Sequence, residues 1–174
     1  MTGSTRFLLP LAFASLCATA ASADSPSLIG SYKDWSAFQT TVNGSRLCYA
    51  MAKPKSSEPK KAARDPAYLM ISDWPGRKAR AELEIVPGYQ YKDGSSVTAE
   101  IGKDKTDFFT KNDGGAGSAW VDDAGTEQKL VGAMQHGAKL VVVGTSQRGT
   151  TTHDTYSLGG LGEALEKVHA TCGM

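Results

Sequence analysis

Hydrophobic and polar side chains alternate over much of residues 35–158, and this two-residue period predicts β-strands. Residues 35–42 alternate aromatic and β-branched side chains with polar ones. Asn43-Gly44 then favours a hairpin, because both residues tolerate positive φ, and the returning strand covers residues 46–52. Further short strands are expected at residues 67–72, 80–87, 95–101, 106–110, 118–121, 139–146 and 150–158.

In two places the spacing of apolar residues changes to that of a helix. Residues 124–136 carry apolar side chains at helical spacing, with Asp122 or Asp123 as an N-cap and Gly137 as a stop. Residues 159–170 show the same spacing on one face. About eight or nine short strands with two short helices predict a mainly β single domain. We expect a β-sandwich or a partly open barrel, with the last helix at the C-terminus.

Residues 1–23 are predicted to be a cleavable signal peptide. Arg6 is their single charge, residues 7–16 form an apolar run, and Ala21-Ser22-Ala23 offers small residues to a signal peptidase. The run is about half of the roughly 20 apolar residues that a membrane-spanning helix needs. The mature domain would therefore comprise residues 24–174 and have no membrane span. We expect it in the periplasm, in association with the outer membrane, or secreted.

The three cysteines bear on both the leader and the fold. Cys17 would be acylated if the leader were a lipoprotein signal, although Leu16 is larger than the residue such signals favour before the cysteine. Cys48 and Cys172 remain after cleavage, and in an oxidising compartment we expect them to form a structural disulfide. A redox or zinc role is the alternative. The chain has no Cys-x-x-Cys motif, however, and His169 would add too few ligands for a zinc site.

The charge balance argues against one class of partner. Removing Arg6 with the leader lowers the count of Lys and Arg from 19 to 18, which equals the 18 Asp and Glu residues. General nucleic-acid binding needs a basic surface, so the sequence predicts no nucleic-acid partner.

No pattern typical of a catalytic, cofactor-binding or metal-binding site stands out. His136, His153 and His169 lie far apart and form no His-Glu-x-x-His motif. The chain also lacks a Gly-x-Ser-x-Gly elbow, although a Ser-His-Asp group could still assemble through the fold. The sequence therefore predicts a protein that is not an enzyme and that holds no cofactor.

Two features of the sequence suit recognition of a partner. Residues 53–66 are rich in proline and charge and are expected to form an exposed loop. The basic residues of this loop are Lys53, Lys55, Lys60, Lys61 and Arg64. They could contact an anionic polymer or a partner surface, although a solvated loop is the simpler interpretation. Trp74, Tyr89 and Tyr91 lie at or near turns, where exposed aromatic residues suit recognition and buried ones suit packing.

Several of these segments together resemble the invasion-associated locus B family, whose members are small exported bacterial proteins. The segments that carry the resemblance are residues 35–52, 68–87, 126–131 with Gly137, 144–150 and 155–160. They correspond to the tryptophan after the mature start, the helix preceded by charged residues, the valine-rich strand, and the closing Ser-Leu-Gly segment that leads into a terminal helix. This chain departs from the family pattern in keeping a single cysteine pair.

The resemblance implies an envelope-associated β-domain without known enzymatic activity, in a family whose founding members are linked to entry into host cells. We therefore expect a non-enzymatic envelope protein that binds a macromolecule of the envelope or of a host surface, with a role in virulence. The alternative is a periplasmic small-ligand carrier, or a hydrolase with a non-local site. That alternative requires a concave pocket lined by polar and aromatic groups.

Overall fold

The computed structural model describes residues 24–60 and 63–174. The predicted signal peptide, Cys17 and Lys61 lie outside the described residues. Within the part of the chain that the structure describes, no helix is both long enough and apolar enough to cross a membrane.

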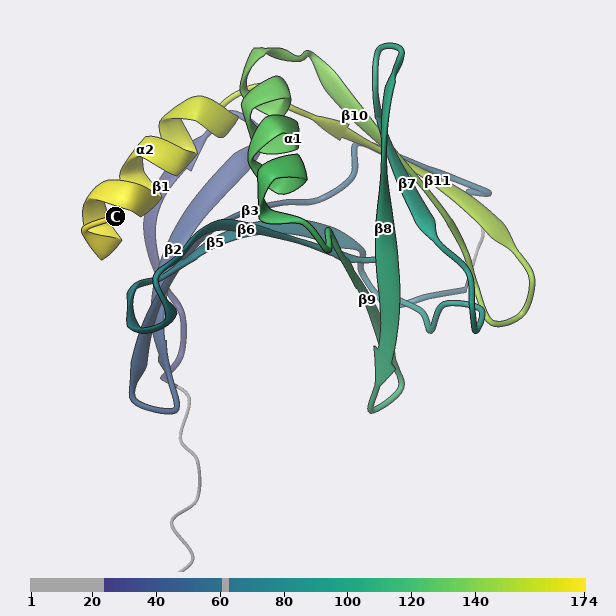
Figure 1. Cartoon of the computed structure of the whole chain (residues 1–174), viewed down its shortest axis with the longest axis horizontal. Coiled ribbons are helices and arrows are strands. Elements are labelled where there is room, and N and C mark those ends of the chain that lie inside the picture. Colours follow the sequence, from purple (N-terminus) through teal and green to yellow (C-terminus); the bar gives the residue numbers. More distant parts are fainter. Residues whose placement is uncertain (1–23, 61–62) are drawn as a thin grey trace, which may run out of the picture.

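The described residues form eleven strands in one antiparallel sheet, in the order β1-β2-β3-β5-β6-β9-β8-β7-β10-β11-β4 (Figure 1). The first six are β1 (Ser27–Tyr32), β2 (Trp35–Val42), β3 (Ser45–Ala52), β4 (Ser56–Glu58), β5 (Tyr68–Trp74) and β6 (Ala79–Val86). The others are β7 (Val97–Ile101), β8 (Asp104–Asp113), β9 (Ala116–Trp120), β10 (Lys139–Thr145) and β11 (Thr151–Ser157). The sheet does not close, because β1 and β4 are its two free edges. The prediction of a mainly β domain is confirmed.

Strand β8 is where the sheet bends. Its first half, residues 104–108, pairs with β7, whereas its second half, residues 109–113, pairs with β9. The strands on the two sides of β8 therefore face each other at an angle across the core (Figure 1). Their inward side chains alternate with outward ones along each strand, as the sequence pattern predicts.

Two helices fill and cover this core, as predicted. Helix α1 (Ala124–His136) begins where the Asp123 side chain accepts a hydrogen bond from the Thr126 N–H at 2.7 Å, and its buried residues face the bent sheet. Helix α2 (Leu161–Cys172) packs on β1, β2 and β3. Its N-cap, Gly160, has φ +94°, and a Cβ there would lie 1.9 Å from the Tyr32 carbonyl oxygen. Only glycine therefore allows this close approach.

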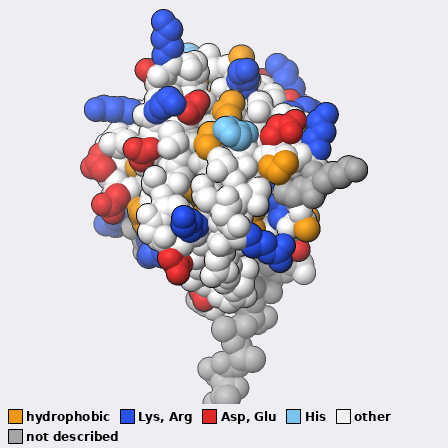
Figure 2. All heavy atoms as spheres, turned by 90° about the vertical axis from the view of Figure 1, so that its right-hand side faces the viewer, with side chains coloured by type: hydrophobic (Ala, Val, Ile, Leu, Met, Phe, Trp, Pro, Cys, Tyr) orange, Lys and Arg blue, Asp and Glu red, His pale blue; other side chains and the backbone are white. Residues whose placement is uncertain are grey.

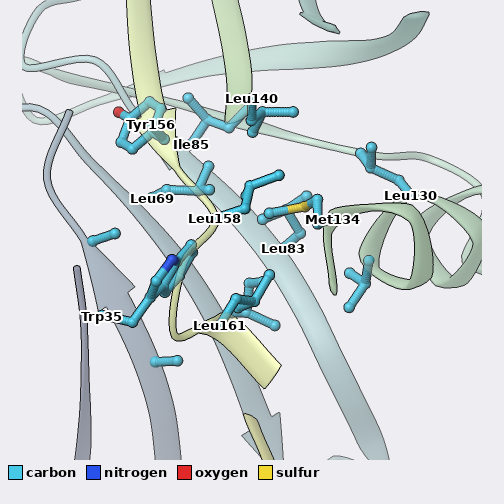
Figure 3. Close-up of a cluster of buried hydrophobic side chains, with 14 of the residues drawn as sticks. Trp35, Leu69, Leu83, Ile85, Leu130, Met134, Leu140, Tyr156, Leu158 and Leu161 are labelled. Atoms are coloured by element: carbon cyan, nitrogen blue, oxygen red, sulfur yellow. The ribbon is translucent and has the colours of Figure 1, made fainter. Parts of the chain in front are cut away.

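The core joins side chains from both sides of the bend and from both helices. Figure 3 shows Trp35, Leu69, Leu83, Ile85, Leu130, Met134, Leu140, Tyr156, Leu158 and Leu161 in one cluster. Trp35 is buried, and its indole N–H donates to the Ser157 carbonyl at 3.0 Å, which links β2 to β11. This continuous cluster makes the described chain one packed unit.

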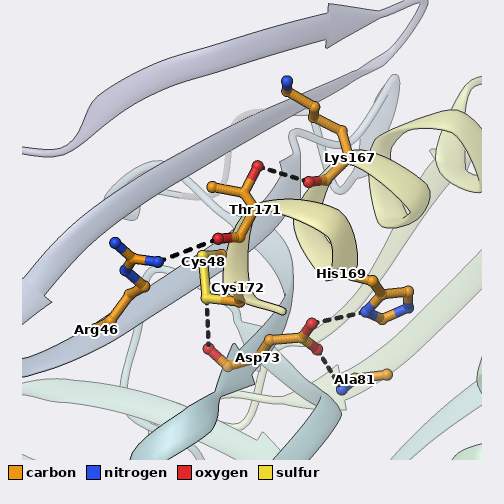
Figure 4. The surroundings of a disulfide bond; sticks show 8 residues. All are labelled: Arg46, Cys48, Asp73, Ala81, Lys167, His169, Thr171 and Cys172. Atoms are coloured by element: carbon orange, nitrogen blue, oxygen red, sulfur yellow. Dashed lines mark hydrogen bonds and ion pairs between the residues drawn. A yellow bond between two sulfur atoms is a disulfide. The ribbon is translucent and has the colours of Figure 1, made fainter. Parts of the chain in front are cut away.

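The disulfide joins Cys48 on β3 to Cys172 at the end of α2, as predicted (Figure 4). Beside it lies Asp73, whose side chain is fully buried. Its carboxylate contacts the His169 ring nitrogen Nδ1 at 2.7 Å and accepts from the Ala81 N–H at 2.9 Å. The C-terminal helix is thus attached to the sheet by a covalent bond and by polar contacts at one place.

Two strands were missed by the sequence prediction, and both are edges of the sheet. Among the described residues, β1 pairs only with β2, and three of its six residues are exposed. β4 has three residues and lies inside the segment expected to be a loop, where Glu58 pairs with His153 of β11. Edge strands bury little, so neither leaves a clear alternation in the sequence.

Candidate functional site

The basic residues predicted to contact a partner have different environments in the structure. Lys53, Lys55 and Lys60 are exposed, and the Lys55 ammonium donates to the Asp34 carboxylate at 2.7 Å. That hydrogen bond holds the pKa of Asp34 below its ordinary value. Arg64 points inward, with only 9% of its side chain exposed. The loop therefore combines exposed lysines with one arginine that belongs to the interior.

Arg64 is fixed on three sides. Its guanidinium forms a bidentate ion pair with Asp154 on β11, and Nη1 also donates to the Pro87 carbonyl at 2.9 Å. It lies over the Tyr89 ring, 5.8 Å from the ring centroid. The hydrogen bonds to Asp154 raise the pKa of Arg64 above its ordinary value. Arg64 thereby attaches the loop before β5 to the end of β6 and to the middle of β11.

A cleft of about 760 Å³ opens in front of this ion pair. Four segments that are distant in sequence supply its walls: the end of the basic loop, the segment after β6, the β8–β9 turn and the β10–β11 turn. Its lining residues are Pro59, Ala63, Arg64, Asp65, Gly88, Tyr89, Gln90, Gly115, Ser146, Gln147, Arg148, Thr150 and Thr152. Its volume lies in the range of ligand sites in proteins, roughly 300–1,000 Å³.

Tyr89 lines the inner wall of the cleft, and the buried Tyr91 lies behind it. The Tyr89 hydroxyl shares a hydrogen bond with the Thr152 hydroxyl at 2.6 Å, and burial raises the pKa of Tyr89. The Tyr91 ring packs edge-on against Tyr89, with 5.5 Å between the ring centroids. Gly144 on β10 makes room for both rings, since a Cβ there would lie 3.0 Å from Tyr91 Cε1 and 3.1 Å from the Tyr89 hydroxyl.

The outer rim is the β10–β11 turn, and hydrogen bonds hold its backbone in place. The Gln147 N–H donates to the Gln90 carbonyl at 2.8 Å, and the Ser146 hydroxyl accepts from the Thr150 N–H at 3.1 Å. The side chains of Gln147, Arg148 and Thr150 are exposed. Among the described residues, no carboxylate lies within 4.0 Å of the Arg148 guanidinium. The rim thus presents free polar groups on a fixed backbone.

The opposite wall depends on one glycine. Gly88 has φ +76°, and its carbonyl accepts from the Asp65 N–H at 2.9 Å. A Cβ at Gly88 would lie 1.9 Å from the Asp65 carbonyl oxygen, so a larger residue would push the two segments apart.

Charges of both signs surround the site. Figure 2 shows the side of the molecule on which β11 lies, with Lys and Arg side chains interspersed among Asp and Glu side chains. The described residues therefore form no large patch of a single sign on this face.

None of the histidines lines the cleft. His153 is exposed on β11, His136 ends α1, and His169 contacts Asp73 beside the disulfide. The described residues include no cluster of three or more His, Cys, Asp or Glu side chains that could hold a metal ion. The hydrogen bonds of the described part of the chain connect no serine or threonine hydroxyl to the His169–Asp73 pair.

Local sequence patterns indicate parts of this site but not that these parts lie together. The sequence pattern places Tyr89 near a turn and leaves residues 147–149 as the short connection between two expected strands. Nothing in the local pattern indicates that this turn meets the segment after β6. No local signal distinguishes Arg64 from its neighbouring basic residues either, because its partner Asp154 is 90 residues away.

Comparisons with known proteins found a matching protein family and solved structures of similar fold. A family model described as "Invasion associated locus B (IalB) protein" matches residues 35–169. The crystal structure of invasion associated protein B from Bartonella henselae is similar in fold, with a TM-score of 0.59 and 15% sequence identity. The alignment covers 85% of this chain and 100% of that one. The search of curated protein sequences found no significant match.

Proposed function

The chain belongs to the invasion associated locus B family, and on this premise we propose that it is an exported envelope protein that binds a macromolecular partner and catalyses no reaction. The partner is a component of the bacterial envelope or of a host surface. A contribution to host-cell invasion would follow from that binding. The leader sequence supports export to the periplasm, with attachment to the outer membrane or secretion as the later steps.

The observation that carries this proposal is the cleft behind the basic loop. The loop that the sequence singles out as a partner contact supplies one of its walls, through Pro59, Ala63, Arg64 and Asp65. The buried ion pair of Arg64 with Asp154 holds this wall in place. A site built on a fixed backbone loses little conformational entropy on binding, which favours recognition.

Photo-crosslinking from the cleft rim tests the proposal. A photoreactive amino acid replaces Thr150, which is exposed and lines the cleft, and the variant is expressed in the cell that makes the protein. The matched control carries the same group at Lys103, an exposed residue of the β7–β8 turn at the opposite end of β8. We expect a discrete crosslinked product from position 150 and none from position 103. The same products from both positions, or none from either, would contradict binding at the cleft.

The exposed lysines are tested separately from the cleft. Lys53, Lys55, Lys60 and Lys61 are replaced together by glutamine, which is polar and removes the charge. If these lysines contact an anionic surface, the crosslinking yield at position 150 falls, and binding becomes less sensitive to salt. Unchanged yield and salt dependence would make this segment a solvated connection.

Intact mass of the protein from the envelope fraction tests export. A chain that begins at Asp24 is expected, with two thiols that react only after reduction. A heavier species that retains an acylated Cys17 would instead identify a lipoprotein.

A periplasmic small-ligand carrier is the second candidate, and the size of the cleft favours it. Between the carrier and the hydrolase, the lining supports the carrier, because none of the lining residues is a histidine that could act as a general base. Native mass spectrometry of the freshly purified protein distinguishes this candidate. A bound small molecule that is lost on substitution of Gln147 would favour a carrier over a macromolecule-binding protein.

A further inference from the structure

We propose that the cleft binds an uncharged glycan segment. This inference rests on the proposed function, since it names the chemistry of the partner at the same site. It is carried by the charge balance of the cleft, by the type of hydrogen-bonding groups in its lining, and by its exposed rim.

The charges at the cleft cancel. Arg64 and Arg148 line it, but Asp65 also lines it, and Asp154 forms the bidentate ion pair with Arg64. Of the lysines of the basic loop that the structure describes, Lys53, Lys55 and Lys60, none is a lining residue. A phosphate or an acidic polymer would need cations in excess, because moving an anion out of water requires compensating charge. The cleft therefore fits a ligand without net charge.

The remaining polar groups are those that suit alcohols and amides. Hydroxyl groups come from Tyr89, Ser146, Thr150 and Thr152, and side-chain amides come from Gln90 and Gln147. Each of these groups can both donate and accept hydrogen bonds. A sugar hydroxyl also does both, so a glycan can pair with such a lining in either direction. An apolar ligand would leave these groups unpaired, which costs free energy.

The interior next to the cleft has unused hydrogen-bonding capacity. The hydroxyl groups of Tyr91 and Tyr156 are fully buried and have no hydrogen-bond partner among the described residues. Tyr91 packs directly against Tyr89, which lines the cleft. Tyr91 therefore places an unpaired buried hydroxyl group behind the wall of the cleft, and Tyr156 places another within the mostly aliphatic cluster shown in Figure 3.

The exposed rim favours a polymeric ligand over an enclosed small molecule. Pro59, Gln147, Arg148 and Thr150 are all exposed, so a ligand seated against Tyr89 and Thr152 could extend past them into solvent. A polymer in the envelope would meet the cleft in this way, with a few of its units bound at a time.

The experiment is calorimetric titration of the purified mature chain with four-sugar probes. The neutral probes are the tetramers of N-acetylglucosamine and of glucose, and the acidic probe is the tetramer of galacturonic acid. We expect at least one neutral tetramer to bind, with an affinity that salt does not change. Binding of the acidic tetramer alone, or of none of the three, would overturn the inference.

Matched variants connect the binding to the cleft. Gln147→Ala removes a rim amide and is expected to weaken binding about fivefold, the effect of about one neutral hydrogen bond. Gln135→Ala, an exposed glutamine on α1, should leave binding unchanged. Equal binding by wild type and Gln147→Ala, or a loss in Gln135→Ala as large as that in Gln147→Ala, would contradict a neutral glycan at this site.

The outcomes separate this inference from the proposed function. If Thr150 crosslinks to an envelope protein while no glycan binds, the proposed function stands and the glycan assignment fails. If neither crosslinking nor glycan binding occurs at the cleft, both fail.

Discussion

The guanidinium of Arg64 and the carboxylate of Asp154 meet in a bidentate ion pair that connects the loop before β5 to β11, with 2.7 Å between Nη1 and Oδ2. Only 9% of the arginine side chain and 4% of the aspartate side chain are exposed. Without this pair, the wall of the cleft that carries Asp65 and Ala63 would lose its attachment to β11 and would be held only by the backbone carbonyls of Pro87 and Gly88. The ion pair therefore positions the candidate site.

Removing one partner of this ion pair should lower the free energy of unfolding substantially. Asp154→Asn leaves the Arg64 charge buried without a counter-ion, and we expect the free energy of unfolding to fall by about 3–5 kcal/mol. Urea denaturation followed by circular dichroism measures the change. The control is Glu100→Gln, which breaks the exposed ion pair with Lys105 and should cost less than about 1 kcal/mol. Equal losses in the two variants would refute a structural role for the buried pair.

The disulfide should account for much of the stability. Cys48 and Cys172 are 124 residues apart in sequence, and a loop of this length predicts about 5 kcal/mol on the chain-entropy model. We expect the double variant Cys48→Ala/Cys172→Ala to unfold at a much lower urea concentration. Wild-type protein under reducing conditions serves as the comparison and should show a similar midpoint. A midpoint that moves little in both would mean that packing of α2 suffices to hold the C-terminus.

Two tyrosines that differ in hydrogen bonding should respond differently to loss of the hydroxyl group. Tyr156→Phe removes a buried hydroxyl without a protein partner, so the free energy of unfolding should stay constant or rise by about 1 kcal/mol. Tyr89→Phe leaves the Thr152 hydroxyl unpaired and should lower the free energy of unfolding by about 1 kcal/mol. Thermal and urea unfolding of both variants test this contrast. A destabilised Tyr156→Phe would indicate that an ordered water binds the hydroxyl in the native protein.

Glu84 should make stability depend on pH. Burial raises the pKa of this carboxyl above its ordinary value of 4.5, although its hydrogen bond with Ser118 acts in the opposite direction. The folded state therefore binds the proton more tightly than the unfolded state. Stability should then decrease as the pH rises from 4.5 through the folded pKa toward neutrality.

Glu84→Gln should flatten this dependence and stabilise the protein at neutral pH. The measurement is the free energy of unfolding in urea across that pH range, for wild type and variant. Glu166→Gln, an exposed position on α2, is the control. The explanation fails if wild type and Glu84→Gln show parallel pH curves.

Local pattern was enough to predict most elements of this fold. The helix expected at residues 124–136 has those bounds in the structure, because an aspartate cap and a glycine stop are both local signals. The hairpin at Asn43-Gly44 forms for the same reason, with both residues at positive φ. The edge strands β1 and β4 escaped prediction, since strands with little burial leave no clear alternation.

The sequence by itself determined most of the strand and helix pattern, the family, and the cysteine pair, because periodicity, turn residues and cysteine count are properties of neighbouring or countable residues. Only the tertiary structure decided that Arg64 is an interior residue, and that four distant segments form one cleft in front of it. Basic residues in a proline-rich loop look alike in sequence. What separates Arg64 from the exposed lysines is a carboxylate 90 residues away, and only the folded sheet brings the two together.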